Sequence, residues 1–152
     1  EHQLELKIMK RLKIQFQKLS KEVVKKVHEY GGLVYSDVIN LYHSKKAISA
    51  GVDGLILVCN GAGGHTGDLS PFAFISEVRS IFDGTIIVGG SISSGDAVLA
   101  IKALGADMAY MGTRFIATEE SDATEDYKQM ILNASASDII KSNKITGVNT
   151  II

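Results

Sequence analysis

Short apolar runs alternate with amphipathic stretches along most of this chain. Runs rich in aliphatic and β-branched side chains predict four buried strands, at residues 33–39, 54–59, 85–89 and 107–112. The segments before and between them have helical spacing, and predict helices over residues 22–30, 41–50, 71–82, 94–104 and 123–134. This strict alternation predicts an α/β fold with a parallel sheet.

Local signals support these boundaries. Gly31 and Gly32 follow the first of these helices, as expected of a C-cap and a turn. Ser70 and Pro71 suit a helix start, and Ser94 suits the N-cap of the helix over residues 94–104. We therefore expect the strands to be parallel and adjacent in chain order.

The first 20 residues have a different pattern. Apolar residues recur there at helical spacing with lysines between them: Leu4, Ile8, Leu12, Phe16 and Leu19. The pattern predicts an amphipathic helix over residues 1–20 that packs on the α/β domain of residues 21–152, in preference to a membrane surface or a partner. Its role is not defined by the pattern.

Composition narrows the class of protein. The hydrophobic share is 45% and the net charge is −1, which indicates a globular chain and no nucleic-acid partner. No apolar run approaches the ~20 residues of a membrane span, and the N-terminus lacks the apolar centre of a signal peptide. We therefore predict a cytoplasmic protein with no membrane partner. A single cysteine, Cys59, excludes an intrachain disulfide and a cysteine zinc cluster.

Glycine clusters follow three of the four predicted strands. They are NGAGGHTG after the second strand, GGS at residues 89–91 and GTR at residues 112–114. Glycines let backbone N–H groups approach a flat or anionic ligand closely. The pattern leaves a doubly wound sheet and a TIM barrel open, but no G-x-G-x-x-G turn of the Rossmann type is present. Barrel enzymes place their chemistry and a phosphate site at such strand ends, which favours the barrel.

The order GVDGLILVCNGAGGHTG, TIIVGGSIS and GADMAYMGTRFIATEES resembles the C-terminal half of the nitronate monooxygenase family, formerly called 2-nitropropane dioxygenases. The resemblance runs from about Glu22 to about Asn143. It implies strands 5–8 of an FMN-binding TIM barrel, and oxidation of alkyl nitronates or nitroalkanes with dioxygen. Flavin-dependent enoyl-ACP reductases are close relatives of this family.

The resemblance also implies site residues. Catalytic roles fall to His43 and His65. By position alone, Asp37 at the end of a strand is a further polar candidate, and Arg114 either offsets phosphate charge or forms a salt bridge at the last strand. The remaining positions would bind FMN, through its phosphate or its ring: Ala62, Gly63, Gly64, Gly89, Gly90, Ser91, Gly112 and Thr113. Replacing Gly90 or Gly112 by Val is expected to weaken FMN retention before it harms the fold.

Acid–base chemistry separates the two histidines. A neutral nitroalkane must lose an α-proton, and a histidine with a pKa near 6.5 can accept it near neutral pH. That role is assigned to His43, whereas His65 is either a polar contact to flavin or substrate or a structural loop residue. Histidines and carboxylates do not occur at ligand spacing in these loops, so no metal is predicted.

A complete barrel takes about 250 residues. Residues 1–20 show no counterpart of the family's first four strands, so a second copy of the chain, as a homo-oligomer, or an N-terminal half is expected to complete the barrel. Two other functions remain open. One is an enoyl-ACP reductase that uses NAD(P)H, and the other is a half-barrel without catalysis.

Overall fold

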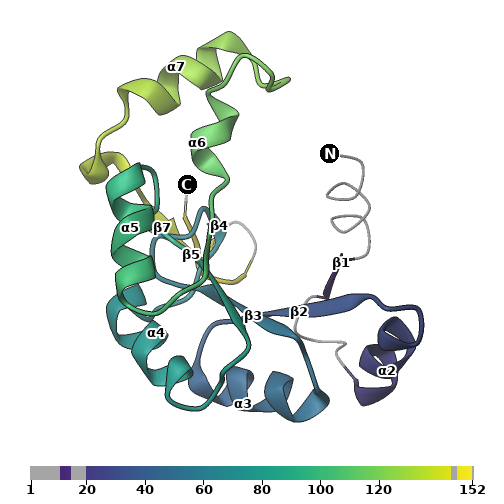
Figure 1. Ribbon diagram of the computed structural model, residues 1–152. Helices are drawn as coiled ribbons and strands as arrows, with labels where there is room; N and C mark the ends of the chain where they lie inside the picture. Colours follow the sequence, from purple (N-terminus) through teal and green to yellow (C-terminus); the bar gives the residue numbers. More distant parts are fainter. Residues whose placement is uncertain (1–10, 15–19, 145–146, 152) are drawn as a thin grey trace.

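The computed structural model describes residues 11–14, 20–144 and 147–151. Its centre is a five-stranded sheet in which all neighbouring strands are parallel and follow chain order (Figure 1). The strands are β1 (Arg11–Ile14), β2 (Leu33–Val38), β3 (Gly54–Val58), β5 (Thr85–Gly89) and β6 (Met108–Tyr110). The predicted parallel α/β fold is confirmed.

Helices connect the strands, and a smaller sheet lies beside the central one. The connecting helices are α2 (Lys21–Glu29), α3 (Leu41–Ala50), α4 (Pro71–Arg79) and α5 (Gly95–Ala103). After β6 come α6 (Thr113–Ile116), α7 (Glu125–Asn133) and a 3₁₀ turn, Ala136–Asp138. The small antiparallel sheet contains β4 (Gly64–His65), β8 (Thr150–Ile151) and β7 (Lys141–Ser142), in that order.

Capping explains where several helices begin and end. Ser94 accepts a hydrogen bond from the Ala97 N–H at 3.2 Å, as predicted for an N-cap. Pro71 occupies the first turn of α4, although the Ser70 side chain makes no capping bond. Gly51 ends α3 with a left-handed φ of 88°, a conformation that glycine adopts without steric cost.

The predicted N-terminal helix is wrong for the residues that the structure describes. Residues 11–14 form strand β1, with Leu12 opposite Val34 and Ile14 opposite Ser36 of β2. Backbone pairing with the edge of β2 outweighs the helical periodicity, which is a weak local preference. The sheet therefore has a fifth strand ahead of the four predicted. Leu4, Ile8, Phe16 and Leu19 lie outside the described residues.

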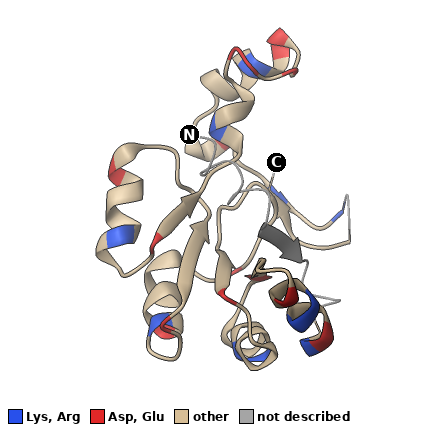
Figure 2. Cartoon of the chain, turned by 45° about the vertical axis from the view of Figure 1, so that its right-hand side comes forward, with Lys and Arg blue, Asp and Glu red and all other residues tan. Residues whose placement is uncertain are grey.

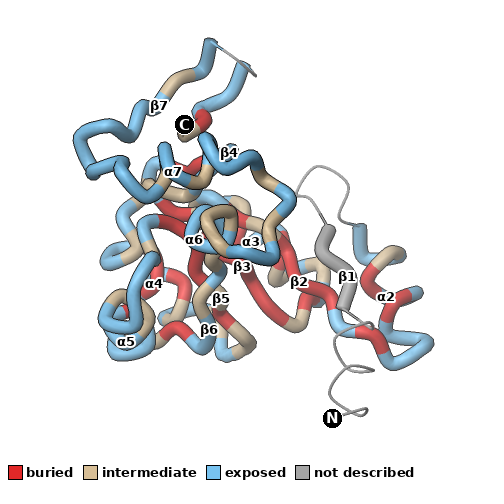
Figure 3. Tube along the Cα trace, turned by 90° about the horizontal axis from the view of Figure 1, so that it is seen from above, coloured by how far each residue is buried: buried red, intermediate tan, exposed pale blue. Residues whose placement is uncertain are grey.

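The two faces of the sheet differ in how they are covered. Side chains that alternate along the central strands, such as Leu55, Leu57 and Ile86, are fully buried against the helices. Figure 3 shows this buried band along β2 and β3. On the opposite face, Met108 and Tyr110 of β6 remain 37% and 49% exposed. Helices thus cover one face of the sheet, while the other is open at the β6 end.

A repeated aspartate clamp ties the amino ends of the strands together. Asp53, just before β3, accepts the Val34 N–H at 2.7 Å, and Asp107, just before β6, accepts the Ile86 N–H at 2.8 Å. A basic side chain from the helix that precedes the bonded strand, α2 before β2 and α4 before β5, then contacts each carboxylate. His28 lies 2.9 Å from Asp53, and Arg79 lies 2.7 Å from Asp107.

Arg79 connects three segments of the chain. Its guanidinium donates to the carbonyl oxygens of Phe82, Gly84 and Gly105 as well as to Asp107. The hydrogen bond from the Ile86 N–H is the main reason why the pKa of Asp107 lies below its usual value. The stabilisation from this carboxylate is therefore present at neutral pH and lost as the pH falls through that lowered pKa.

Replacing Arg79 is expected to destabilise the fold. Arg79→Ala should lower the free energy of unfolding by about 2–3 kcal/mol, because several carbonyls and one carboxylate lose a charged donor. Arg79→Lys keeps the positive charge but lacks the planar guanidinium group. Its free energy of unfolding should lie between those of Arg79→Ala and the unmodified protein. Urea unfolding measures the effect, with Glu77→Ala on the exposed side of the same helix as the control. Equal midpoints for Arg79→Ala and Glu77→Ala would contradict this assignment.

Candidate active site at the carboxyl ends of the strands

Four loops leave the carboxyl ends of parallel strands, and so lie at one edge of the sheet. They follow β2 at residues 39–40, β3 at residues 59–70 (which include β4), β5 at residues 90–94 and β6 at residues 111–112. The loop after β5 contains no Lys, Arg, Asp or Glu and the loop after β3 contains Asp68 alone, and Figure 2 shows these residue types mainly on the helices. The backbone therefore supplies most of the polar groups of these two loops.

Hydrogen bonds join the loop after β3 to the loop after β5. The Cys59 N–H donates to the Gly89 carbonyl at 2.8 Å, and the Ser91 N–H donates to the Gly61 carbonyl at 3.0 Å. A Cβ on Gly61 would collide with the Ser91 side chain, and the φ of Gly61 is 90°. Glycine is therefore required at position 61 for the two loops to meet.

The other two loops also meet the loop after β3. A Cβ on Gly63 would lie 2.7 Å from the Thr113 Oγ1, at the start of α6. A Cβ on Gly67 would collide with the Val58 carbonyl and lie 3.5 Å from the Cβ of Ile39, in the loop before α3. All four loops thus form one connected surface around the glycine-rich segment.

The two glycines expected at a phosphate site differ in their surroundings. A Cβ on Gly112 would meet no atom within 4 Å, so the backbone there borders open space that a ligand can enter. Gly90 has a φ of 131°, and its Cβ would lie 2.9 Å from the Asn60 carbonyl oxygen. Gly90→Val is therefore expected to strain the fold, in contrast to the expectation from the sequence, whereas no neighbouring atom opposes a side chain at Gly112.

The remaining predicted phosphate contacts have distinct positions. Gly89 is the last residue of β5 and is buried. Ser91 has a left-handed φ of 54°, uncommon for a residue other than glycine, and its side chain is exposed. Its N–H is bonded to the Gly61 carbonyl, and its hydroxyl oxygen lies against Gly61. Thr113 is exposed at the start of α6.

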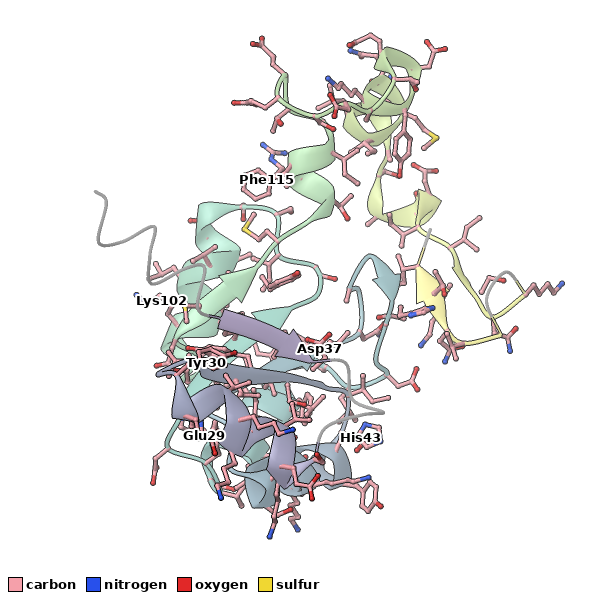
Figure 4. All side chains as sticks on the ribbon, turned by 90° about the vertical axis from the view of Figure 1, so that its right-hand side faces the viewer. Glu29, Tyr30, Asp37, His43, Lys102 and Phe115 are labelled. Carbon is pink, nitrogen blue, oxygen red and sulfur yellow. The ribbon has the colours of Figure 1, made fainter. Side chains whose placement is uncertain are left out.

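His43 lies in the first turn of α3, beyond the carboxyl end of β2. Its N–H donates to the Asn40 side chain at 2.9 Å, which fixes the start of this helix. In Figure 4 His43 and Asp37 are at the end of the sheet opposite Glu29 and Tyr30. Burial of the ring, and secondarily the charge of Lys46, lowers the pKa of His43 below 6.5. The imidazole is therefore mainly neutral at pH 7 and able to accept a proton.

His65 lies in β4, within the loop after β3. Its backbone pairs with Thr150 of β8, and its side chain is exposed. Ala62 is partly buried, whereas Gly63 and Gly64 are exposed beside it. The predicted loop thus presents a histidine and bare backbone at the surface where the four loops meet.

Other polar candidates contribute less to this surface. Asp37 is half-buried within β2, and Arg114 is exposed on α6. Cys59 is fully buried, and burial raises the pKa of its thiol to about 12, which excludes a thiolate at neutral pH. In the parts of the chain that the structure describes, no group of three His, Cys, Asp or Glu could hold a metal ion.

Sequence reasoning missed two features of the site. Thr66 is buried, and its hydroxyl can donate to the carbonyls of Cys59 at 3.1 Å or Gly67 at 3.2 Å. An open hollow of about 550 Å³ borders Gly112 and is lined also by Phe115, Ile116, Thr118, Glu120 and Ser121. Buried threonines and surface hollows leave no periodic pattern in a sequence, so only the fold reveals them.

A parallel sheet with glycine loops gathered at its carboxyl edge is the arrangement of TIM-barrel enzymes. The chain belongs to the nitronate monooxygenase family, whose family model matches residues 6–150. The match begins well before the predicted limit near Glu22, and so includes the segment that forms β1. Among the described helices, none has the length and apolar character needed to cross a membrane.

Two relatives illustrate the family in sequence. Over 127 residues the chain is 30% identical to a nitronate monooxygenase of Paraburkholderia phytofirmans, covering 77% of this chain and 34% of that protein. It is also 30% identical to a 5-hydroxy-7a-methyl-1-oxo-octahydro-1H-indene-4-carboxyl-CoA dehydrogenase of Rhodococcus jostii. That match covers 84% of this chain and 36% of the dehydrogenase. The chain therefore spans about a third of the length of these relatives.

Two solved structures illustrate it in three dimensions. FabK from Thermotoga maritima is 28% identical, with a TM-score of 0.82 over 93% of this chain and 45% of that one. Nitroalkane oxidase from Streptomyces ansochromogenes is 25% identical, with a TM-score of 0.84 over 93% of this chain and 44% of the oxidase. Both are TIM-barrel enzymes, and this chain corresponds to slightly less than half of each.

Proposed function

We propose that this chain forms the cofactor-binding half of a flavin-dependent nitronate monooxygenase, with FMN as its cofactor and dioxygen as the oxidant. The observation that carries the proposal is the meeting of four strand-end loops around the glycine-rich segment, in a chain of this family. When bound, a flavin accepts electrons from the substrate carbon and passes them to dioxygen. The protein binds and orients both partners.

The proposed roles follow the positions of the loops. The loops after β5 and β6 would hold the phosphate, through the backbone at Gly90, Gly112 and Thr113 and the Ser91 hydroxyl. The open space at Gly112 leaves room for a phosphate group at backbone distance. Residues 62–65 would line the flavin ring, since their exposed glycines leave a flat, side-chain-poor surface.

His43 is the proposed base for neutral nitroalkanes. Its ring is partly buried, and the resulting lowered pKa keeps it neutral at pH 7. A neutral imidazole nitrogen can take the α-proton of a nitroalkane, which turns the substrate into the nitronate anion that is then oxidised. A substrate supplied as the nitronate does not need this step.

An absorbance spectrum and an oxygen electrode test the proposal on the full-length protein. The purified protein should show flavin bands, release FMN on denaturation, and consume oxygen when a nitronate is added. A protein that binds no flavin when reconstituted with FMN would overturn the proposal and leave the half-barrel without catalysis. A protein that retains FAD instead of FMN would correct the cofactor alone.

The hollow beside Gly112 favours a second candidate, a flavin-dependent enoyl-ACP reductase. Its lining includes Phe115 and Ile116, which could accommodate an apolar acyl chain next to the cofactor loops. This enzyme would consume NAD(P)H with an enoyl thioester and would not need a nitronate. Comparing NAD(P)H consumption with nitronate-dependent oxygen uptake separates the two candidates.

His65 is expected to serve both forms of the substrate. His65→Ala should lower kcat/KM roughly three- to tenfold for nitroalkane and nitronate alike, the loss expected of one polar contact. Steady-state oxygen uptake on both substrates provides the comparison, with Lys45→Ala on the exposed side of α3 as the control. Unchanged kinetics for His65→Ala would make it a structural loop residue.

A further inference from the structure

The C-terminal segment pairs with the glycine-rich loop that would line the flavin ring. Thr150 lies opposite His65 and Ile151 opposite Gly64, in antiparallel register. One residue further along the loop, the Thr66 N–H donates to the Asn149 carbonyl at 3.0 Å. Three consecutive loop residues thus have their backbone fixed by residues 149–151.

Side chains tie the same two segments together. Lys141 of β7 forms an ion pair with Asp68, and the Asn149 amide donates to the same carboxylate oxygen at 3.4 Å. The bond from Lys141 is the main reason why the pKa of Asp68 is lowered. Lys141 lies 73 positions from Asp68 in the chain, and Asn149 lies 81 positions from it. Both contacts therefore form only when residues 141–149 fold back onto the loop.

The loop needs such support because its own sequence does not fix its shape. Gly61 and Gly64 have left-handed φ values of 90° and 75°, and glycines lose more conformational freedom on ordering than other residues. On the strand side, the Thr66 hydroxyl and Gly67 hold the loop against β3. On the outer side, the described support is the C-terminal segment, and His65 lies between the two.

We infer that residues 141–144 and 147–151 act as a strap that holds the loop of residues 61–68 in one conformation, with Asp68 and Lys141 as positioning residues for His65. An exposed ion pair contributes little to global stability, so its loss should act locally on the loop. The consequence for the ligand rests on the proposed function: a loosened loop should retain flavin less well and contact substrate less often.

Hydrogen–deuterium exchange on the full chain without ligand tests the strap itself. In Lys141→Ala, the amides of residues 62–68 should exchange about two- to fivefold faster, while those of β3 and β5 remain unchanged. Lys141→Arg should restore slow exchange because it keeps the charged donor. Lys144→Ala, an exposed lysine of the same segment, is the matched control and should exchange like the unmodified protein.

The outcomes separate the strap from the proposed function. Unchanged exchange at residues 62–68 in Lys141→Ala overturns the strap, as does a general increase across the whole sheet. Faster local exchange with flavin dissociation and KM unchanged overturns the positioning role. If the unmodified protein binds no flavin, the proposed function fails, and the exchange data alone still decide whether the strap exists.

Discussion

His43→Ala should slow the turnover of neutral nitroalkanes by about 10²- to 10⁴-fold, the range typical of a lost general base. Nitronates should lose far less, because they arrive already deprotonated. The position of His43 in the first turn of α3, beside the loop that contacts Gly67, supports this role. The measurement is kcat/KM for a nitroalkane and for its nitronate, taken by oxygen uptake on the same enzyme preparation.

His28→Ala is the matched control for this experiment. His28 is also a helical histidine, but it contacts Asp53 at the amino ends of the strands, far from the loops. It should leave the nitroalkane-to-nitronate ratio unchanged. Equal losses on both substrate forms for His43→Ala would remove it as the base and leave it a binding or structural residue.

The pH dependence gives a second measure of the same group. Burial lowers the pKa of His43 below 6.5, so the basic form already predominates at neutral pH. For nitroalkanes, kcat/KM should therefore rise as the pH increases through a value below 6.5 and level off above it. This step should vanish in His43→Ala and be absent for nitronates. An inflection above pH 7 would contradict the assignment.

Gly112→Val should weaken flavin binding roughly 10- to 100-fold with little effect on the fold. A valine side chain at this position would occupy the open space beside the backbone, and the charged hydrogen bonds that a phosphate would make there are worth about 1.5–3 kcal/mol each. Flavin titration followed by fluorescence gives the dissociation constant. Circular dichroism during heating gives the stability of the same variant.

Two other glycines define what this result means. Gly95→Val, at the first turn of α5, also adds its Cβ to open space and should retain flavin. Gly90→Val should instead lower stability, because its φ is left-handed and its Cβ would press on the Asn60 carbonyl. Unchanged flavin affinity in Gly112→Val would place the phosphate elsewhere.

Most of the sheet could be predicted from the sequence because its strands are buried. Apolar runs such as residues 54–59 and 85–89, each followed by a loop that contains glycine, define strand and loop without knowledge of the partners. Residues 11–14 carry no such signal. They become a strand through pairing with β2, some 20 positions away in the chain, and local periodicity contains no information about that contact.

The site could be predicted in outline for a similar reason. Parallel strands end at one edge, so the glycine clusters after β3, β5 and β6 had to meet there. The packing of the loops against each other decides the finer details. It determines that the Ser91 N–H is already hydrogen-bonded and that Gly112 borders open space. Two-residue strands such as β4 and β8 are too short to show any period, and so their pairing was not predictable.

The repeated aspartate clamp has a consequence for how this protein can evolve. Asp53 and Asp107 make equivalent bonds to the strand before them, so two units of the sheet share the same aspartate clamp. Each aspartate clamp lies at the amino ends of the strands, opposite the loops at their carboxyl ends. Substitutions in the strand-end loops should therefore leave the aspartate clamps intact, because the two lie at opposite ends of the same strands.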